Sequence, residues 1–223
     1  MTNRTRLART GAHTVMIGLS TLALFPVYWM VQTSFRPETE IFSTGFWPSA
    51  PTLDNYRGVM RSMPIFAILW NTFAMAAATT LAQVATGLLA AWALVRWRFP
   101  GGRIAHSLIA LSWLVPFQVV MIPNYVLATK LGLLDTLAGL VIPNAAAAFA
   151  VLVLYNAMRG FPREVVEAAR MDGAGSLRTL LEVVIPNLRA PIASIAILCF
   201  ISAWNDYFWP LLLIRRIENS VVQ

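Results

Sequence analysis

The chain has 223 residues, of which 58% are hydrophobic and only 12% are charged, about half the charged fraction of an ordinary soluble domain. A compact soluble fold of this length cannot bury so much apolar surface, so the composition excludes one. The net charge of +7 would usually indicate nucleic acid or anionic lipid as a partner. Sixteen of the seventeen cations, however, are arginines placed between long apolar runs, which favours a membrane lipid environment and no nucleic acid.

The first apolar stretch, residues 14–33, follows Arg4, Arg6 and Arg9 and has the charge pattern of a signal peptide. It is long enough to cross a bilayer, and no small-residue cleavage site follows it. We therefore predict a retained first membrane helix, preceded by a cytoplasmic segment of residues 1–13.

Residues 34–63 connect this helix to the next apolar interval. Because Pro37, Pro48 and Pro51 lie in this segment and Pro64 follows it, we predict a folded-over connection without a further helix.

Four more intervals without charge are long enough to span a membrane core of about 30 Å, which needs roughly 20 apolar residues. The last of them is interrupted only by Asp206. Together with the first helix they predict an all-α membrane protein with five transmembrane helices. The four further spans cover residues 66–95, 104–123, 136–158 and 190–214.

The distribution of basic residues predicts the orientation of these helices. With the N-terminus in the cytoplasm, the inner segments hold eleven Lys and Arg residues and the outer segments hold six, as the positive-inside rule requires. Residues 215–223 then form an outer segment. An odd number of spans leaves two readings open, a truncated chain or a protein with five helices.

The longest inner connection, residues 159–189, is predicted to form two short helices. Pro162 suits a first helical turn, where its missing N–H is not needed, and Gly173 is placed to end this helix in a left-handed conformation. Ser176 is a candidate N-cap for a second helix, which Pro186 would end or kink. Its spacing places four apolar residues on one face that needs a partner: Leu177, Leu180, Leu181 and Val184.

A motif in this loop resembles one found in a known family. Glu167-Ala168-Ala169 is followed, after three residues, by Gly173, and then by Val183, Ile185 and Pro186 at the spacing E-A-A-x3-G-x9-I-x-L-P. This is similar to the motif of the permease subunits of bacterial ABC importers. Val183 and Ile185 depart from the pattern but keep branched apolar side chains. The resemblance implies the type I ABC-importer permease fold and a cytoplasmic position for residues 159–189.

In that family the loop is the coupling helix, which docks into a cleft of a separate ATPase. The small residues Ala168, Ala169, Gly173 and Ala174 would permit close approach of the two backbones, and the carboxylates of Glu167 and Asp172 would bind the partner. The alternative for Glu167 is an ion pair one turn away on its own helix, with Arg163 or Arg170.

A wider resemblance covers nearly the whole chain and implies the carbohydrate-uptake branch of these permeases, the maltose and glycerol-phosphate type. It rests on SFRPETEIF and PTLDNY after the first span, on IPNYVLATKLGLLDT, and on the W-N-D-Y-F-W-P block at residues 204–210. Members of that branch have a sixth helix and a cytoplasmic C-terminus, so the resemblance favours a truncated chain.

Asp206 lies within a predicted span, where an acidic residue indicates a functional site. Asp206, Asn205 and Gln118 are therefore candidates for the translocation pathway. The alternative for Asp206 is a packing hydrogen bond near the membrane interface, beside an aromatic belt of Trp204, Tyr207 and Trp209.

The sequence lacks the motifs of an enzyme. A P-loop needs G-x-x-x-x-G-K-[ST], but Lys130, the single lysine, lies between Thr129 and Leu131. We therefore expect no cofactor in this chain, with ATP and Mg²⁺ on a partner ATPase. His13 and His106 are not spaced as a metal pair, and Cys199 is predicted to be a small buried hydrophobe, so no metal site is expected.

These observations predict a permease subunit of an ATP-driven carbohydrate importer in the bacterial inner membrane, forming half of the translocation pathway. The expected partners are a homologous second permease, ABC ATPase subunits and an extracytoplasmic solute-binding protein. The alternatives are a permease for glycerol phosphate or a peptide, a five-helix membrane scaffold, or a truncated remnant that only binds the ATPase.

Overall fold

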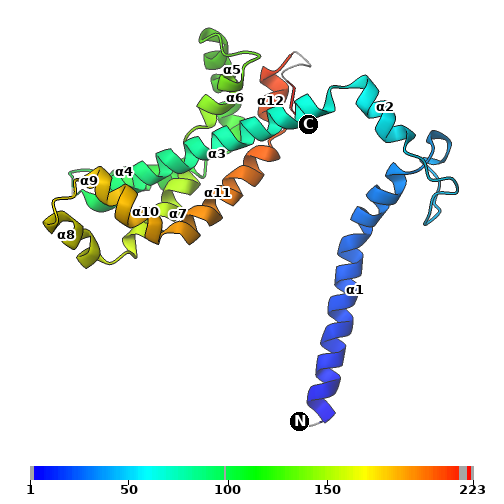
Figure 1. Ribbon diagram of the computed structural model, residues 1–223, viewed down its shortest axis with the longest axis horizontal. Helices are drawn as coiled ribbons and strands as arrows, with labels where there is room; N and C mark the ends of the chain where they lie inside the picture. The colour runs from blue at the N-terminus through cyan, green and yellow to red at the C-terminus, as the bar shows by residue number, and fades with distance from the viewer. Residues whose placement is uncertain (1–2, 98, 216–219, 222–223) are drawn as a thin grey trace. The chain divides into compact units, whose positions relative to one another are not determined.

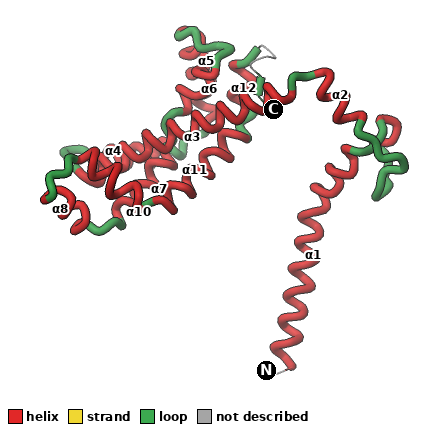
Figure 2. The backbone as a smooth tube through the Cα atoms, viewed as in Figure 1, coloured by secondary structure: helices red, strands yellow, loops and turns green. Residues whose placement is uncertain are grey.

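The computed structural model describes residues 3–97, 99–215 and 220–221, and these residues form helices and turns without a β-strand (Figures 1 and 2). The prediction of an all-α fold is confirmed. The chain divides into two compact units, Met1–Ile65 and Phe66–Gln223. Arg98 and Arg216, two of the cations counted above, lie outside the described residues, as does most of the predicted outer segment 215–223.

The first unit is dominated by one long helix, α1 (Asn3–Ser34), which contains the predicted first span. Its part Arg9–Ser34 is long and apolar enough to cross a membrane, and none of its most apolar stretch is buried. This surface therefore suits a lipid environment or a partner helix.

Two short helices follow in the same unit, the 3₁₀ turn η1 (Glu38–Glu40) and α2 (Asp54–Ser62). The prediction that this segment holds no further helix is wrong for the nine residues of α2. Pro51 and Pro64 flank α2 and neither lies inside it, so they limit its length without preventing it.

The second unit is a bundle of helices around α3 (Ile65–Arg96), whose first residue belongs to the first unit. The predicted second span lies within α3. The other helical elements follow in chain order: α4 (Gly102–Ser112), α5 (Phe117–Lys130), α6 (Leu137–Val141), the 3₁₀ turn η2 (Ile142–Asn144), α7 (Ala148–Arg159), α8 (Arg163–Met171), α9 (Ser176–Thr179), the π-helical turn η3 (Leu180–Val184), α10 (Ile185–Asn187), α11 (Arg189–Trp204) and α12 (Phe208–Leu213).

Two of the predicted spans, residues 104–123 and 136–158, are bent, because the chain turns by 98° between α4 and α5 and by 50° between η2 and α7. A third bend, of 85° between α10 and α11, lies at the predicted boundary between the loop and the fifth span. That fifth span, residues 190–214, is itself broken between α11 and α12. A proline lies at or next to each of the three bends, and proline bends a helix because it removes a backbone hydrogen bond. The three are Pro116, Pro143 and Pro186. By length and composition, α1 and α3 are each sufficient to cross a membrane, and the total reaches five if each bent pair counts as one span.

The first of two hydrophobic clusters joins α3, α7, η3 and α11. At Gly87 of α3 an added Cβ would lie 3.1 Å from Cδ1 of Leu154, so the two helices approach closely, as small residues permit in membrane proteins. Cys199 is buried here without a disulfide, which confirms its prediction. The buried members are Ala91, Trp92, Ala150, Leu154, Met158, Leu180, Val184, Ile195 and Cys199.

The second cluster joins α3, α5, α6 and α12. Trp209 is only 1% exposed, and its indole Nε1 donates a hydrogen bond to the Gly139 carbonyl oxygen at 3.1 Å. A Cβ at Gly139 would lie 2.1 Å from the Leu133 carbonyl oxygen, so only glycine fits. Of the three aromatic residues in the alternative interfacial belt, Trp209 is therefore buried against Gly139, whereas Tyr207 is exposed.

Within the second unit the basic connections lie together. Figure 1 shows α8, α9 and the start of α4 at one end, and α5, α6 and α12 at the other. The Trp92 indole near the end of α3 donates to the Ser176 hydroxyl in α9, and α12 contacts α5 and α6. The connections that carry the predicted inner arginines thus share one end of this bundle.

Candidate functional site

The first candidate site is α8, which carries the Glu167-Ala168-Ala169 motif. It begins after Pro162 and ends in a Schellman motif, in which the Ala174 N–H donates to the Ala169 carbonyl and the Gly173 N–H donates to the Arg170 carbonyl, each at 3.0 Å. Gly173 has φ +82°, the left-handed conformation that favours glycine. The predicted C-terminal end of this helix is confirmed, whereas Pro162 is the N-cap and precedes the first helical turn in which it was predicted to lie.

The second helix of the loop, from α9 to α10, differs from its prediction at its start. Gly175 is the N-cap, and Ser176 is the first helical residue. The Ser176 hydroxyl instead accepts a hydrogen bond from the Trp92 indole at 3.0 Å, because a buried indole N–H needs an acceptor. The helix ends at Asn187, one residue after Pro186, as predicted.

The four apolar residues of this second helix do not share one face. Leu180 and Val184 are buried in the first cluster, whereas Leu177 and Leu181 are more than half exposed. The buried side also includes Thr179, so it is centred away from Leu177 and Leu181. The π-helical turn over Leu180–Val184 further reduces the rotation per residue.

The solvent-exposed surface of the loop of residues 159–189 carries both polar and apolar side chains. Glu167, Ala168, Asp172 and Gly173 are exposed, and Ala169 and Ala174 are half-buried. Val183 and Ile185 are half-buried and Pro186 is exposed. The loop also exposes four large apolar side chains: Val165, Met171, Leu177 and Leu181.

Ion pairing within the loop does not involve Glu167. Among the described residues, the pairs within 4.0 Å are Arg57–Asp54 and Arg178–Glu182. The alternative that paired Glu167 with Arg163 or Arg170 therefore lacks support, and its carboxylate faces solvent.

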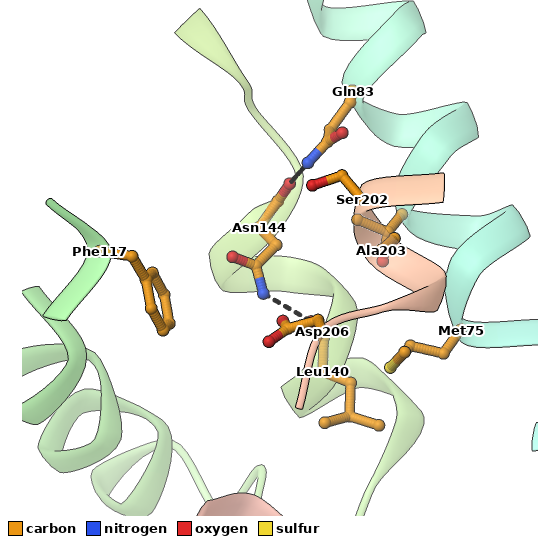
Figure 3. A pocket seen from close by; sticks show the side chains of 9 residues that line it. Met75, Gln83, Phe117, Leu140, Asn144, Ser202, Ala203 and Asp206 are labelled. Atoms are coloured by element: carbon orange, nitrogen blue, oxygen red, sulfur yellow. Dashed lines mark hydrogen bonds between the residues drawn. The ribbon is translucent and has the colours of Figure 1, made fainter. Parts of the chain in front are cut away.

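The second candidate site is a cavity of about 300 Å³ where two helix breaks face α3 (Figure 3). One break lies between η2 and α7, and the other lies between α11 and α12. Gln83 and Thr86 of α3 donate hydrogen bonds to the carbonyl oxygens of Asn144 and Ala145, at 2.8 and 2.9 Å. Side chains thus satisfy backbone groups that the first break releases, a requirement for irregular backbone at membrane depth.

Asp206 lies in the second break and lines this cavity. Its Oδ1 accepts the backbone N–H of Trp209 at 3.4 Å, in the first turn of α12. Figure 3 shows the Asp206 and Asn144 side chains extending into the same space. The lining holds polar groups and one carboxylate but no Lys or Arg: Met75, Thr79, Gln83, Phe117, Leu140, Asn144, Ser202, Ala203 and Asp206.

The other two pathway candidates do not line the cavity. Asn205 is exposed, and its side-chain amide donates to the Ile201 carbonyl at the end of α11. Gln118 is exposed, whereas its neighbour Phe117 lines the cavity, because consecutive helical side chains point in different directions. Sequence reasoning missed Thr79, Gln83, Asn144 and Ser202. Their signal was a polar side chain within an apolar interval.

Comparison with known proteins covers both candidate sites. The sequence profile of the family described as "Binding-protein-dependent transport system inner membrane component" matches residues 83–217. The chain belongs to this family. The matched residues of this permease family include α8 and most of the cavity lining.

Named relatives of this family member are transport permeases. It is 31% identical over 219 residues to the sn-glycerol-3-phosphate transport system permease protein UgpE of Brucella abortus (strain 2308), covering 94% of this chain and 78% of that one. The UgpE protein of Escherichia coli O6:K15:H31 (strain 536 / UPEC) is 30% identical over 215 residues, covering 93% and 76%.

A solved structure shows the same fold. The match is a bacterial ABC transporter involved in the import of the acidic polysaccharide alginate, with a TM-score of 0.81 and 28% identity, covering 98% of this chain and 78% of that one. The resemblance to ABC-importer permeases is thereby confirmed, and the chain is an inner-membrane permease component and not itself an enzyme.

Proposed function

We propose that this permease forms half of the translocation pathway of an ATP-driven carbohydrate importer and is driven through α8 by a separate ATPase. The assembly contains a second, homologous permease, two ATPase subunits that hold ATP and Mg²⁺, and an external solute-binding protein. The N-terminus and α8 lie in the cytoplasm, in agreement with the arginines gathered at the α8 end of the second unit.

The surface of α8 carries this proposal. Its carboxylates at Glu167 and Asp172 are exposed and have no ion pair within the described residues, so they are available to a partner's donors. Exposed Met171, Leu177 and Leu181 add apolar area beside them, and burial of such side chains stabilises an interface. ATP-driven closure of the ATPases would then move α8 and, through the buried Leu180 and Val184, the helices of the first cluster.

The cavity supports a carbohydrate as the transported solute. Hydroxyl, amide and carboxylate groups beside Phe117 suit the hydroxyls and the apolar ring faces of a sugar. The second candidate solute is glycerol phosphate, which is favoured by the two UgpE relatives. An anionic solute would pass close to the Asp206 carboxylate, with no cation among the lining residues.

The coupling role is tested by the double variant Glu167→Gln, Asp172→Asn in the assembled transporter. The expected result is loss of ATPase co-purification, and Gly173→Asp should have the same effect by adding a charge at the end of α8. Glu164→Gln on the same helix is the matched control. An intact assembly with normal transport in these variants would contradict the proposal.

Asp206→Asn separates the two solutes in proteoliposomes that contain the whole importer and its binding protein. If the solute is a neutral sugar, uptake should stay the same or fall, because the variant loses a carboxylate acceptor for the sugar hydroxyls. Faster uptake of glycerol phosphate by this variant, with no transport of maltose by the parent, would establish glycerol phosphate instead.

A further inference from the structure

A second, larger cavity lies at the opposite end of α3 from Asp206, outside the pathway. It has a volume of about 770 Å³. It opens between the end of α3, the first two turns of α4, and Tyr155 of α7. Aromatic and polar side chains share its lining: Trp97, Phe99, Arg103, His106, Ser107 and Tyr155. Nothing in the coupling loop or the proposed pathway uses these groups.

The spacing on α4 brings three polar side chains together. Arg103, His106 and Ser107 are related by three and four residues, so they lie on one face of the helix. The His106 ring contacts the Tyr155 ring of α7, with ring centres 4.5 Å apart. This contact packs α4 against α7 at the wall of the cavity. Tyr155 and Ser107 also present hydroxyl groups there.

The lining of this cavity carries one formal positive charge, at Arg103, and no carboxylate. Residues 55–134, which include α3 and α4, contain no Asp or Glu, and α7 contains none. Within the part of the chain that the structure describes, Arg103 forms neither an ion pair nor a hydrogen bond. A guanidinium is suited to bidentate binding of a phosphate, so the complementary ligand is a phosphate-bearing anion.

The surroundings favour a lipid over a free anion. The cavity follows directly on α3, a helix of 32 residues that is apolar enough to span a membrane, so it lies at the membrane boundary. Trp97 and Phe99 are exposed beside it, and tryptophan prefers the level of the headgroups. Leu94 adds an apolar wall, which suits an acyl chain. Basic pockets between membrane helices bind anionic headgroups in this way.

We propose that this cavity binds the phosphate headgroup of one anionic phospholipid, with Arg103 as the principal ligand and with His106, Ser107 and Tyr155 around it. The lipid would fill the space between α4 and α7 and link the turn after α3 to α7. This site is independent of the transported solute and of ATPase docking.

The test measures lipid retention by the purified chain in detergent, by native mass spectrometry with added phosphatidylglycerol or phosphatidylcholine. The parent protein should retain phosphatidylglycerol preferentially, and Arg103→Gln should weaken it about five-fold, the effect of one basic side chain at an anionic surface. Arg103→Lys, which keeps the charge, should bind between the two. Arg189→Gln, which removes a basic side chain outside the cavity, should leave retention unchanged.

Three results would overturn the proposal. These are equal retention of the two lipids by the parent, equal loss of phosphatidylglycerol in Arg103→Gln and Arg189→Gln, or no gain of Arg103→Lys over Arg103→Gln. Displacement of the lipid by millimolar inorganic phosphate would assign the cavity to a free anion and would contradict the lipid as its ligand. The Arg103→Gln variant should still co-purify with the ATPase, so its loss of lipid is distinguished from a loss of coupling.

Discussion

The connecting segment of residues 34–63 in the first unit and the loop of residues 159–189 in the second both join helices through short helices, but their polar groups differ in burial. In the connecting segment Arg36 is 0% exposed. Its guanidinium donates to Oε1 of Gln32 at 2.9 Å and to the carbonyl oxygens of Glu40, Ser43 and Gly45, and it lies over the Trp29 ring.

The same segment is closed by residues from the P-T-L-D-N-Y stretch. The Asn55 amide donates to the carbonyl oxygens of Ser34 and Arg36, at 3.0 and 2.7 Å, and the Tyr56 ring contacts the Phe35 ring. Asn55 therefore satisfies carbonyls at the end of α1. The two stretches that support the family resemblance here are thus joined in space.

In the loop of residues 159–189, by contrast, Arg163, Glu167 and Arg170 remain exposed. Four large apolar side chains remain exposed as well. The connecting segment of residues 34–63 satisfies the polar groups of Arg36 within the chain, whereas the exposed leucines of the 159–189 loop leave apolar surface for the proposed partner. This difference predicts that substitutions at Arg36 damage folding, while substitutions on the exposed side of the 159–189 loop damage assembly.

The largest expected effect is that of Arg36→Met. Methionine keeps much of the volume but leaves the part-buried carbonyl oxygens of Glu40, Ser43 and Gly45 without their donor, each costing about 1–3 kcal/mol. We expect the segment to lose about 4 kcal/mol of stability in total. Limited proteolysis of the purified protein should then cut within residues 38–49, while ATPase co-purification persists. Arg57→Met, at an exposed ion pair, is the control. Equal protease resistance of the two variants would refute the organising role of Arg36.

Leu180 and Leu181 are adjacent and chemically identical, and they provide the sharpest test inside the loop of residues 159–189. Leu180 is 1% exposed and Leu181 is 53% exposed. Leu180→Ala should lower the free energy of unfolding by about 3 kcal/mol, because it leaves a cavity in the first cluster. Leu181→Ala should change stability by less than about 0.5 kcal/mol, but it should weaken ATPase binding. If Leu181→Ala leaves the assembly intact, the exposed leucine is not part of the docking surface.

The smallest expected effect concerns pH. Hydrogen bonds from the Ser49 hydroxyl and then the Ser49 backbone N–H hold the pKa of Glu40 below its usual 4.5. Because this pKa is lowered in the folded state, its contribution to stability is present above pH 4.5 and is lost as the pH falls through the lower, folded value. Cleavage of the connecting segment of residues 34–63 by an acid-active protease should therefore increase in that pH range. Glu40→Gln should show no such increase, and a parallel increase in both proteins would exclude this carboxyl.

The sequence predicted much of the structure of the loop of residues 159–189 because its signals are local. Pro162 and Gly173 mark the ends of α8 through backbone geometry, which needs no tertiary partner. The start of the second helix was missed by one residue because a distant indole, that of Trp92, uses the Ser176 hydroxyl. The division between Leu180 and Leu181 was missed as well, since helical spacing gives a shared stripe but not the direction of the core.

By itself, the sequence determined that this protein is an α-helical membrane permease and where the helix with the Glu167-Ala168-Ala169 motif begins and ends, since apolar runs and backbone breakers act over short distances. Only the tertiary structure decided which polar groups meet. Gln83 reaches the Asn144 carbonyl across 61 positions, and Asp206 joins them at the cavity. These meetings depend on how broken helices turn toward α3 and on close approaches at Gly87 and Gly139, which are properties of packing between distant segments.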